Sequence, residues 1–342
     1  MGALVSSGSV VQTLDRARCL VEPALQAAVD RLPAQMRTVA GYHFGWWDAA
    51  GAPIRAGAGK AIRPALVVLC AEAVGGAATA AVGAAVAVEL VHNFSLLHDD
   101  IIDGDATRRH RAAAWTVYGT PAAILAGDSL LTQALRVLAA SAPQPGPVVD
   151  RLCAALLELV AGESADVAFE SRTDVGVDEY LEMAAGKTAA LVACACELGA
   201  LAGGGSPDAA ERLRSFGHHL GLAFQMVDDL LGIWGDPQVT GKPVGADLRT
   251  RKSSLPVVAA LTSETAAGRQ FAALYARPEP LTDAQLHTAA QLVEEAGGRT
   301  GTEKQAHRQV ALALSQLDDA TFVPTAVRQL AELSHLVTDR DW

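Results

Sequence analysis

Helical periodicity dominates this sequence. Along almost every long segment, apolar residues recur at spacings of three and four, and Ala, Leu, Glu and Arg are abundant. Residues at these spacings share one face of an α-helix, and these residue types favour helices. Of the 342 residues, 50% are apolar, which is enough for a sizeable buried core. The sequence therefore predicts an all-α protein.

Chemical signals mark several helix ends. Thr120 and Ser206 each precede a proline, which is typical of a helix start, and Thr282 with Gln285 forms a capping-box pattern whose helix should stop near Gly297. The Pro-rich residues 141–147 are few enough to be an interhelical loop. We expect residues 1–15 to be a flexible N-terminus and residues 16–342 to form a single domain.

The charge balance argues against several partners. The chain carries 38 acidic and 27 basic side chains, which disfavours nonspecific binding to nucleic acid or anionic membranes. The chain start shows no secretory-signal pattern, and five cysteines without metal-type spacing fit a reducing compartment. The most apolar run, residues 188–205, contains Glu197, whose charge would be costly inside a bilayer. We expect a cytoplasmic protein with no transmembrane segment.

Four aspartates crowd the stretch HDDIIDGDATRR at residues 98–109. If residues 84–102 form one helix, Asp99 and Asp103 lie one turn apart on the same face. Two like charges at this spacing repel, whereas a divalent cation would bind both through its preference for oxygen ligands. A solvated, Asp-rich loop is the alternative.

A second acidic pair, Asp228 and Asp229, lies in the apolar stretch FQMVDDLLGIWGD. Both carboxylates would be costly in mid-helix unless they faced a polar cavity. Two helices that offer carboxylates to one cavity would form a multi-metal site. Mg²⁺ suits it, because this ion prefers hard oxygens, keeps several waters and completes its shell with substrate phosphates.

Basic residues accompany both acidic stretches. Arg108 and Arg109 follow the first, further basic residues follow the second, and Lys187 lies in an otherwise apolar helix. In an acidic chain this indicates an anionic ligand, such as a diphosphate, held between metals and cations. Salt bridges to the aspartates are the alternative for Arg108 and Arg111, but they explain Lys187 poorly.

These motifs, in this order, resemble the short-chain trans-isoprenyl diphosphate synthase family, and geranylgeranyl diphosphate synthases in particular. The resemblance runs from about Gly57 to Pro256. The matches are Asp99, Asp100 and Asp103 with Arg108 and Arg109, GKxxRP at residues 59–64, His92, Lys187-Thr188, FQxxDD at residues 224–229, and GKPxGxDL at residues 241–248. The resemblance implies a homodimer whose helical bundle, the isoprenoid synthase fold, surrounds a deep central pocket.

The resemblance also implies the site residues. Three Mg²⁺ ions would bridge Asp99, Asp103 and Asp228 to the diphosphate of an allylic substrate. The residues implied to hold that diphosphate are Arg108, Lys187, Thr188, Gln225 and Lys242; those implied to bind isopentenyl diphosphate are Lys60, Arg63, His92 and Arg109.

The implied reaction is the head-to-tail condensation of isopentenyl diphosphate with the allylic diphosphate. An allylic C–O bond can ionise when metals and cations arranged beforehand neutralise the departing diphosphate. The carbocation must be kept from water, so we expect an apolar pocket. The isopentenyl double bond attacks the cation, and the released diphosphate takes the final proton.

Some positions depart from the family pattern. Gly232 stands where the second motif has its third aspartate, with Asp236 one turn later, and Ala61 and Glu163 replace an arginine and a glutamine. We expect these departures to affect efficiency rather than reaction class. Phe94, five residues before Asp99, is expected to form the floor of the elongation pocket. That floor implies a short product, C20 first and C15 next.

Other functions stay open at this point. A class I terpene cyclase on the same fold would have no use for the isopentenyl-binding residues. A non-catalytic partner subunit of another synthase would be favoured by loss of the first motif, which is intact. A diphosphate hydrolase would need a base that positions water, and none is identified.

Overall fold

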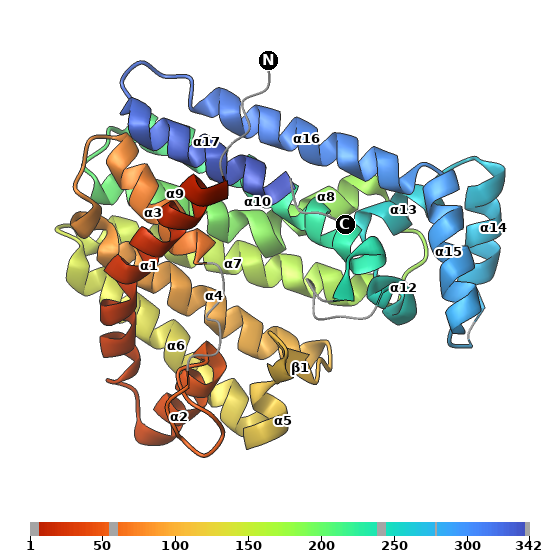
Figure 1. Ribbon diagram of the computed structural model, residues 1–342, viewed down its shortest axis with the longest axis horizontal. Coiled ribbons are helices and arrows are strands. Elements are labelled where there is room, and N and C mark those ends of the chain that lie inside the picture. Colours follow the sequence, from red (N-terminus) through yellow and green to blue (C-terminus); the bar gives the residue numbers. More distant parts are fainter. Residues whose placement is uncertain (1–6, 55–60, 238–243, 278, 339–342) are drawn as a thin grey trace. The chain divides into compact units, whose positions relative to one another are not determined.

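The computed structural model describes residues 7–54, 61–237, 244–277 and 279–338, and these residues are helical almost throughout (Figure 1). In chain order the elements are α1 (Ser7–Val29), α2 (Ala34–Phe44), α3 (Ile62–Ala73), the 3₁₀ turn η1 (Ala78–Ala81), α4 (Val82–Ile102), β1 (Thr107–Arg108), β2 (Arg111–Ala112), α5 (Ala114–Tyr118), α6 (Thr120–Ser141), α7 (Pro145–Phe169), α8 (Val177–Ala184), the π-helical turn η2 (Ala185–Ala189), α9 (Ala190–Ala202), α10 (Pro207–Trp234), α12 (Ala246–Thr250), α13 (Leu255–Leu261), α14 (Ala266–Tyr275), α15 (Asp283–Glu295), α16 (Gly298–Gln316) and α17 (Pro324–Thr338).

The chain divides into two compact units. Unit 1 comprises residues 1–153, 194–214 and 319–332, and unit 2 comprises residues 154–193, 215–318 and 333–342. The single domain expected over residues 16–342 stays a prediction.

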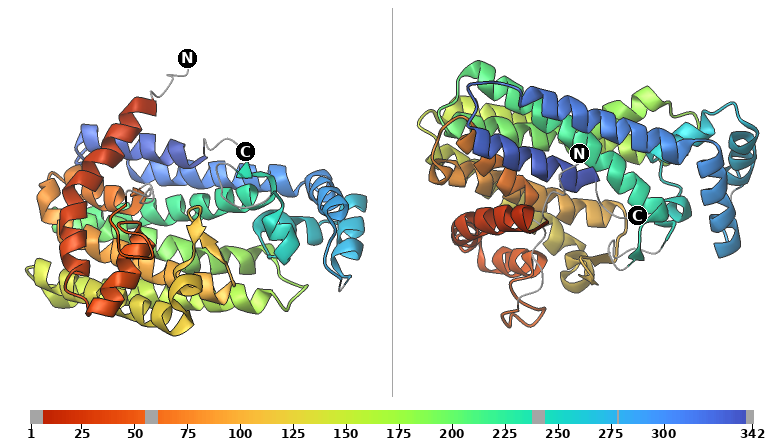
Figure 2. Two further views of the ribbon diagram at one scale, coloured as in Figure 1. Left: turned by 60° about the horizontal axis from the view of Figure 1, so that its bottom comes forward. Right: turned by 45° about the horizontal axis from the view of Figure 1, so that its top comes forward.

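Unit 1 is built on the long helix α4, which packs along α6 and also contacts α1 and α3 (Figures 1 and 2). Leu90 and Leu97 of α4 and Leu130 of α6 are fully buried, so the apolar face predicted from the periodicity forms this core. The predicted helix over residues 84–102 is confirmed, since α4 begins at Val82 and ends at Ile102.

The N-terminal expectation needs correction. Helix α1 begins at Ser7, so residues 7–15 are helical rather than part of a flexible segment. Val10 and Leu14 are buried on the same face of this helix, and Thr13 beside them accepts a hydrogen bond from Gln329. Val10 and Leu14 are four residues apart, so they share this face of the helix. Burial of the face explains why the helix extends so far toward the chain start.

Unit 2 surrounds α13, which contacts α8, α14, α15 and α16. One buried cluster gathers around Tyr180, Met226 and Val227, and a second joins Phe271 to Ile233 and Leu248. Most of these contacts join segments far apart in the chain, so this core forms only when α10 and the C-terminal helices pack together.

Two of the predicted helix starts are confirmed and one is shifted. The Ser206 hydroxyl accepts a hydrogen bond from the Ala209 amide at the start of α10, and Thr282 caps α15 through Gln285. Helix α6, however, includes Thr120, and its N-cap is Gly119 at φ 85°. That backbone conformation favours glycine, which explains why the threonine is displaced from the cap by one residue.

Within the described part of the chain, three helical stretches are long and apolar enough to cross a membrane by length and composition: Ala78–Ile102, Thr120–Ser141 and Val177–Ala202. Of their most apolar windows, 61%, 44% and 72% are buried inside the protein. Packing within the fold therefore accounts for much of this hydrophobicity. The expected absence of a transmembrane segment stays a prediction.

Candidate active site

The first aspartate motif lies at the C-terminal end of α4 in unit 1. Asp103 is the exposed C-cap residue, and its amide donates a 2.8 Å hydrogen bond to the carbonyl of Asp99 one turn earlier. Asp99 is partly buried. The two carboxylates thus leave neighbouring positions of one helical face, as the spacing predicts.

Asp100, between them, has a different role. Its carboxylate is buried, and its Oδ1 accepts hydrogen bonds from Arg108 Nε at 2.8 Å and Nη2 at 2.5 Å. Burial alone would lower the pKa of the Arg108 guanidinium, but the hydrogen bond and charge of Asp100 raise it overall. The salt-bridge alternative for Arg108 is therefore observed. For Arg111 it is not: its guanidinium donates to the carbonyls of Tyr42 and Trp47.

The hairpin of β1 and β2 fixes the arginine pair. Arg108 faces Arg111 in the antiparallel register, and the two loop residues Arg109 and His110 have φ values of 52° and 61°. Both lie in the left-handed region, which costs a residue with a side chain about 1–2 kcal/mol. Such strain is typical of functional loops. The sequence pattern around the arginine pair did not reveal this hairpin, because two-residue strands leave no periodicity.

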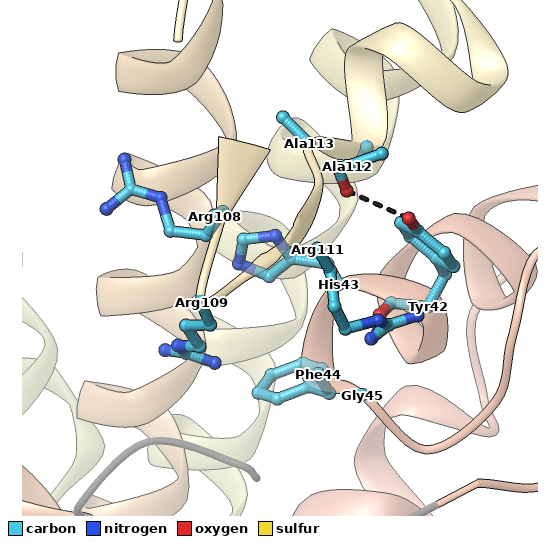
Figure 3. Close-up of a pocket in the computed structure, with 10 residues that line it drawn as sticks. Tyr42, His43, Phe44, Gly45, Arg108, Arg109, Arg111, Ala112 and Ala113 are labelled. Carbon is cyan, nitrogen blue, oxygen red and sulfur yellow. Dashed lines mark hydrogen bonds between the residues drawn. The ribbon is translucent and has the colours of Figure 1, made fainter. Parts of the chain in front are cut away.

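A pocket in unit 1 is lined by the end of α2, by the hairpin and by the start of α5 (Figure 3). The imidazole of His43 lies between Arg108 and Arg109 in this view. His43 is buried, and its Nε2 has no hydrogen-bond partner among the described residues. Burial, with the charges of Arg109 and Arg108, lowers the pKa of His43 to about 3, so the ring is neutral. His43 belongs to none of the sequence motifs, so nothing in the sequence pointed to it.

Two residues expected to bind isopentenyl diphosphate meet directly in unit 1. Arg63 Nη1, from the start of α3, lies 3.2 Å from His92 Nε2 on α4. Burial, followed by the charges of Arg63 and Arg109, lowers the pKa of His92 well below its usual range. His92 is therefore a neutral ring beside cations. Lys60 lies outside the described residues.

Phe94 is buried on α4, five residues before Asp99. Its ring packs edge-on against His98, with ring centroids 4.8 Å apart, and His98 Nε2 lies 3.1 Å from the carbonyl of Ile124 on α6. A Cβ at Gly127 of α6 would overlap the His98 ring. The aromatic pair therefore fills space between α4 and α6. Its role in product length stays a prediction.

The two aspartates of the second motif, on α10 in unit 2, lie in different environments. Asp228 is exposed, whereas Asp229 is buried and accepts hydrogen bonds from Tyr180 Oη at 2.5 Å, the Leu255 amide at 2.7 Å and Gln225 Nε2 at 2.9 Å. Burial raises the pKa of Asp229, although these hydrogen bonds oppose it. The expectation that both carboxylates face a polar cavity is thus wrong for Asp229, which the core satisfies.

Other residues of unit 2 are implied to bind a diphosphate. Those that the structure describes form hydrogen bonds or ion pairs with side chains of the protein. Thr188 Oγ1 donates a 2.5 Å hydrogen bond to Gln225 Oε1. Lys187 Nζ lies 2.7 Å from Glu163 Oε2 and 2.6 Å from Asp166 Oδ2. Burial alone would lower the pKa of Lys187, but the two carboxylates raise it overall. Lys242 lies outside the described residues.

Lys187 lies in the π-helical turn η2, a form that often marks a functional position. This turn packs against α7 through glycine. A Cβ at Gly162 would lie 2.7 Å from the carbonyl carbon of Gly186 and 2.8 Å from Cα of Lys187, and closer still to the Lys187 amide. Only a glycine lets the two backbones approach so closely, so Gly162 sets the position from which the Lys187 side chain starts.

The donor set suits a hard cation that also binds substrate oxygens. Among the described residues, no three His, Cys, Asp or Glu side chains are grouped closely enough to hold a metal ion by themselves. Mg²⁺ commonly uses one or two carboxylates and completes its shell with water and substrate phosphate. Asp99 and Asp103 offer such a pair in unit 1, and Asp228 offers an exposed carboxylate in unit 2. These residues fit the ion.

The polyprenyl synthetase family model matches residues 46–293, about three-quarters of the chain. The chain belongs to the polyprenyl synthetase family. This polyprenyl synthetase is 46% identical over 330 residues to the geranylgeranyl diphosphate synthase of Mycobacterium tuberculosis, covering 96% of this chain and 93% of that protein. It is 45% identical over 325 residues to the (2E,6E)-farnesyl diphosphate synthase of the same organism, covering 94% and 90%.

Comparison with solved structures supports the same family assignment. The crystal structure of a polyprenyl synthetase from Streptomyces coelicolor A3(2) has a TM-score of 0.91 and 47% identity, covering 96% of this chain and 99% of that one. A geranylgeranyl pyrophosphate synthetase from Pyrococcus horikoshii has a TM-score of 0.85 and 29% identity, covering 96% and 99%. The all-α isoprenoid synthase fold expected from the sequence is confirmed for this polyprenyl synthetase, and the terpene cyclase alternative is not favoured.

Proposed function

We propose that this protein is a short-chain isoprenyl diphosphate synthase that condenses isopentenyl diphosphate head-to-tail with an allylic diphosphate. The family match over residues 46–293, which include both aspartate motifs, carries this proposal. Relatives named farnesyl and geranylgeranyl diphosphate synthase, at 45% and 46% identity, support the short chain length.

Isopentenyl diphosphate is bound by Lys60, Arg63, His92 and Arg109 in this proposal. The close approach of Arg63 to His92, 3.2 Å, supports a shared ligand, because a neutral imidazole beside arginines accepts or donates a hydrogen bond without adding repulsion. The strained loop conformation of Arg109 holds its guanidinium at the hairpin tip, where it can contact a phosphate.

The allylic diphosphate is held by Arg108, Lys187, Thr188, Gln225 and Lys242. In the structure, Lys187 is paired with Glu163 and Asp166, and Thr188 donates a hydrogen bond to Gln225. The carboxylates compete with the diphosphate for Lys187, whereas the bond between Thr188 and Gln225 keeps these two side chains ordered, so less of their conformational entropy is lost on binding.

Three Mg²⁺ ions complete the site, with Asp99, Asp103 and Asp228 as protein ligands. When bound, they neutralise the charge that develops on the departing diphosphate. The protein's cations do the same from the other side, and apolar helix faces keep water away from the allylic cation. Phe94 limits the length of the product. The expected product is C20, and C15 is the second choice.

The test is incubation of purified protein with Mg²⁺, isopentenyl diphosphate and, separately, dimethylallyl, geranyl or farnesyl diphosphate, with products resolved by chain length. A linear C20 or C15 diphosphate is the expected result, and EDTA should abolish its formation until Mg²⁺ is added back. Cyclic hydrocarbon formed without isopentenyl diphosphate would show a cyclase instead. No turnover with any primer would support the non-catalytic subunit.

The protein forms a homodimer in this proposal. On α7, Leu157, Val160 and Val167 are 72%, 53% and 41% exposed and share one face of the helix. An apolar stripe of this kind is typical of a surface that another protein covers. Light scattering should give a dimer for the wild type and a monomer for Leu157→Glu. Val11→Glu on α1, where the valine is 56% exposed, is the control and should leave the dimer intact.

We also propose a cytoplasmic location. None of the five cysteines is in a disulfide bond, which fits a reducing compartment. Cell fractionation should find the full chain in the soluble fraction. Recovery with membranes, resistant to a carbonate wash, would instead show that one of the three long apolar helices is inserted.

A further inference from the structure

A carboxylate lies beside the cations that are proposed to bind isopentenyl diphosphate. Glu89 stands on α4 three residues before His92, so the two side chains leave the same face of the helix. His92 Nε2 in turn lies 3.2 Å from Arg63 Nη1. The charges of Arg63 and Arg109 both act on the Glu89 carboxylate, which places it next to this cluster. The proposed reaction assigns no role to Glu89.

Asn93, one turn further along α4, fixes the position of this carboxylate. Asn93 is fully buried, and its Nδ2 donates hydrogen bonds to the carbonyl of Glu89 at 2.8 Å and to its Oε1 at 2.9 Å. Part of the Glu89 side chain stays accessible. The carboxylate therefore cannot move away from the arginines without breaking the hydrogen bond to Asn93.

Opposing influences act on the protonation state of Glu89. Burial raises the pKa of its carboxyl group overall, whereas the hydrogen bond to its Oε1 and the charges of Arg63 and Arg109 lower it. The neighbouring rings of His92 and, on α2, His43 are neutral near pH 7, because burial lowers both pKa values. Among the described residues of α1 and α6, which also pack against α4, no charge acts on this carboxylate. The two arginines are thus the cations that favour its ionised form.

A bound diphosphate would change this balance. It carries several negative charges near neutral pH, and it would take the guanidinium groups of Arg63 and Arg109 as its own partners. Glu89 would then share its two cations with a second anion and would also face that anion's like charge. Both effects favour the neutral carboxyl group.

We propose that the binding of isopentenyl diphosphate to this cluster is coupled to the uptake of one proton from solvent by the Glu89 carboxylate. This inference rests on the proposed function. The proton forms an O–H bond on the carboxylate, and no other covalent bond forms or breaks. Because the complex holds one more proton than the free protein, the affinity for isopentenyl diphosphate falls as the pH rises. Glu89 thereby sets the pH range in which this substrate binds.

The test is titration calorimetry of the full-length protein with isopentenyl diphosphate, without allylic substrate, in buffers that differ in ionisation enthalpy. The slope of the binding enthalpy against the ionisation enthalpy of the buffer gives the number of protons taken up. We expect the wild type to take up more protons than Glu89→Gln, by up to about one per ligand. Between pH 7 and pH 9, wild-type affinity should also fall by up to about tenfold per pH unit, and Glu89→Gln should lose most of this dependence.

Three variants keep the test decisive. Glu89→Gln retains the oxygen that accepts the hydrogen bond from Asn93, so a thermal melt should show it folded. Glu158→Gln, at an exposed position of α7, is the matched control and should take up protons as the wild type does. In Asn93→Ala the lost hydrogen bond raises the pKa of Glu89 further in the free protein, so proton uptake should shift to higher pH.

Equal proton uptake by the wild type and Glu89→Gln would overturn the inference. Uptake that disappears in His43→Asn but persists in Glu89→Gln would assign the proton to the imidazole and overturn it as well. If the wild type binds isopentenyl diphosphate with this proton but forms no prenyl product, the proposed reaction fails and the binding inference stands. If the wild type elongates but Glu89→Gln leaves the uptake unchanged, only this inference fails. If isopentenyl diphosphate does not bind, both fail.

Discussion

One carboxylate oxygen of Asp100 accepts two hydrogen bonds from the guanidinium of Arg108. This pair joins the end of α4 to the strand β1, so the aspartate motif and the arginine pair move as one piece of unit 1. Asp100 thus connects the end of α4, whose carboxylates are proposed to bind metal, to the hairpin, whose arginines are proposed to bind phosphate.

Removal of this link should destabilise the protein. Asp100→Ala leaves the partly buried guanidinium of Arg108 without its partner, and breaking a buried pair on one side costs about 3–5 kcal/mol. Urea unfolding should show a loss of about 3 kcal/mol, at the lower end because Arg108 retains 26% exposure. Asp150→Ala, an exposed position on α7, is the control. An unchanged midpoint for Asp100→Ala would contradict the structural role.

Glu163→Gln should strengthen binding of the allylic substrate. Glu163 and Asp166 both hold Lys187, and the second carboxylate oxygen of Glu163, Oε1, is buried with no hydrogen-bond partner among the described residues. Without the Glu163 charge, Lys187 is released to a diphosphate more easily, and about 1 kcal/mol would lower the KM for the allylic substrate about fivefold. Steady-state kinetics should show this decrease, with the KM for isopentenyl diphosphate unchanged.

Glu158→Gln, on an exposed position of α7, is the matched control for Glu163 and should leave both KM values as they are. A higher KM for the allylic substrate in Glu163→Gln would mean that Glu163 orders Lys187 for binding and does not compete for it.

Phe94→Ala should lengthen the product. If the ring forms the pocket floor, its removal opens space beside His98, and chain elongation should continue past the wild-type length. Product analysis by chain length is the measurement, at a temperature where a melting curve shows the variant folded, because loss of a buried phenylalanine costs about 3–5 kcal/mol. Phe271→Ala in the core of unit 2 is the control. An unchanged product distribution would remove Phe94 from the floor.

The pH dependence of stability should report on His43. Its pKa is about 3 in the folded protein and near 6.5 when unfolded, so between these values the unfolded chain binds a proton that the native protein cannot. This contribution to stability is therefore complete above pH 6.5 and is lost as the pH falls toward 3, by about 1.4 kcal/mol per pH unit.

His92 acts in the same direction as His43, so the informative quantity is a difference. Between pH 7 and pH 5, the unfolding free energy of the wild type should fall more steeply than that of His43→Asn. Parallel curves for the two proteins would show that His43 is not held neutral.

The sequence was most informative where the physical cause is local. The span of α4, the Ser206 cap and the Thr282 capping box depend on neighbours within one or two turns, and they were predicted correctly. The four-residue spacing of Asp99 and Asp103 on one helical face belongs to the same class. Their chemical meaning came from the family motifs and not from the spacing.

What could not be predicted depends on contacts between distant segments. Asp229 was expected to face a polar cavity, but Tyr180, 49 positions away, satisfies it in the core. The pKa of His43 falls because packing buries its ring and because the hairpin brings Arg109 and Arg108 beside it. The carboxylate of Asp247 lies where a Cβ at Gly232 would be, although the two residues are on different helices. No periodicity in the sequence predicts these contacts between distant residues.

The contact of Gly162 with the backbone of Lys187 has a consequence for directed evolution. In a saturation library of α7, exposed positions on either side of Gly162 should accept many residues, whereas position 162 should return glycine alone among active clones. Suppose that recombination replaces α7 or the turn η2 alone with the segment of a relative. The hybrid should then be active only when the new segment also lets the two backbones approach this closely. The two segments are inherited as one block, although 25 positions separate Gly162 from Lys187 in the chain.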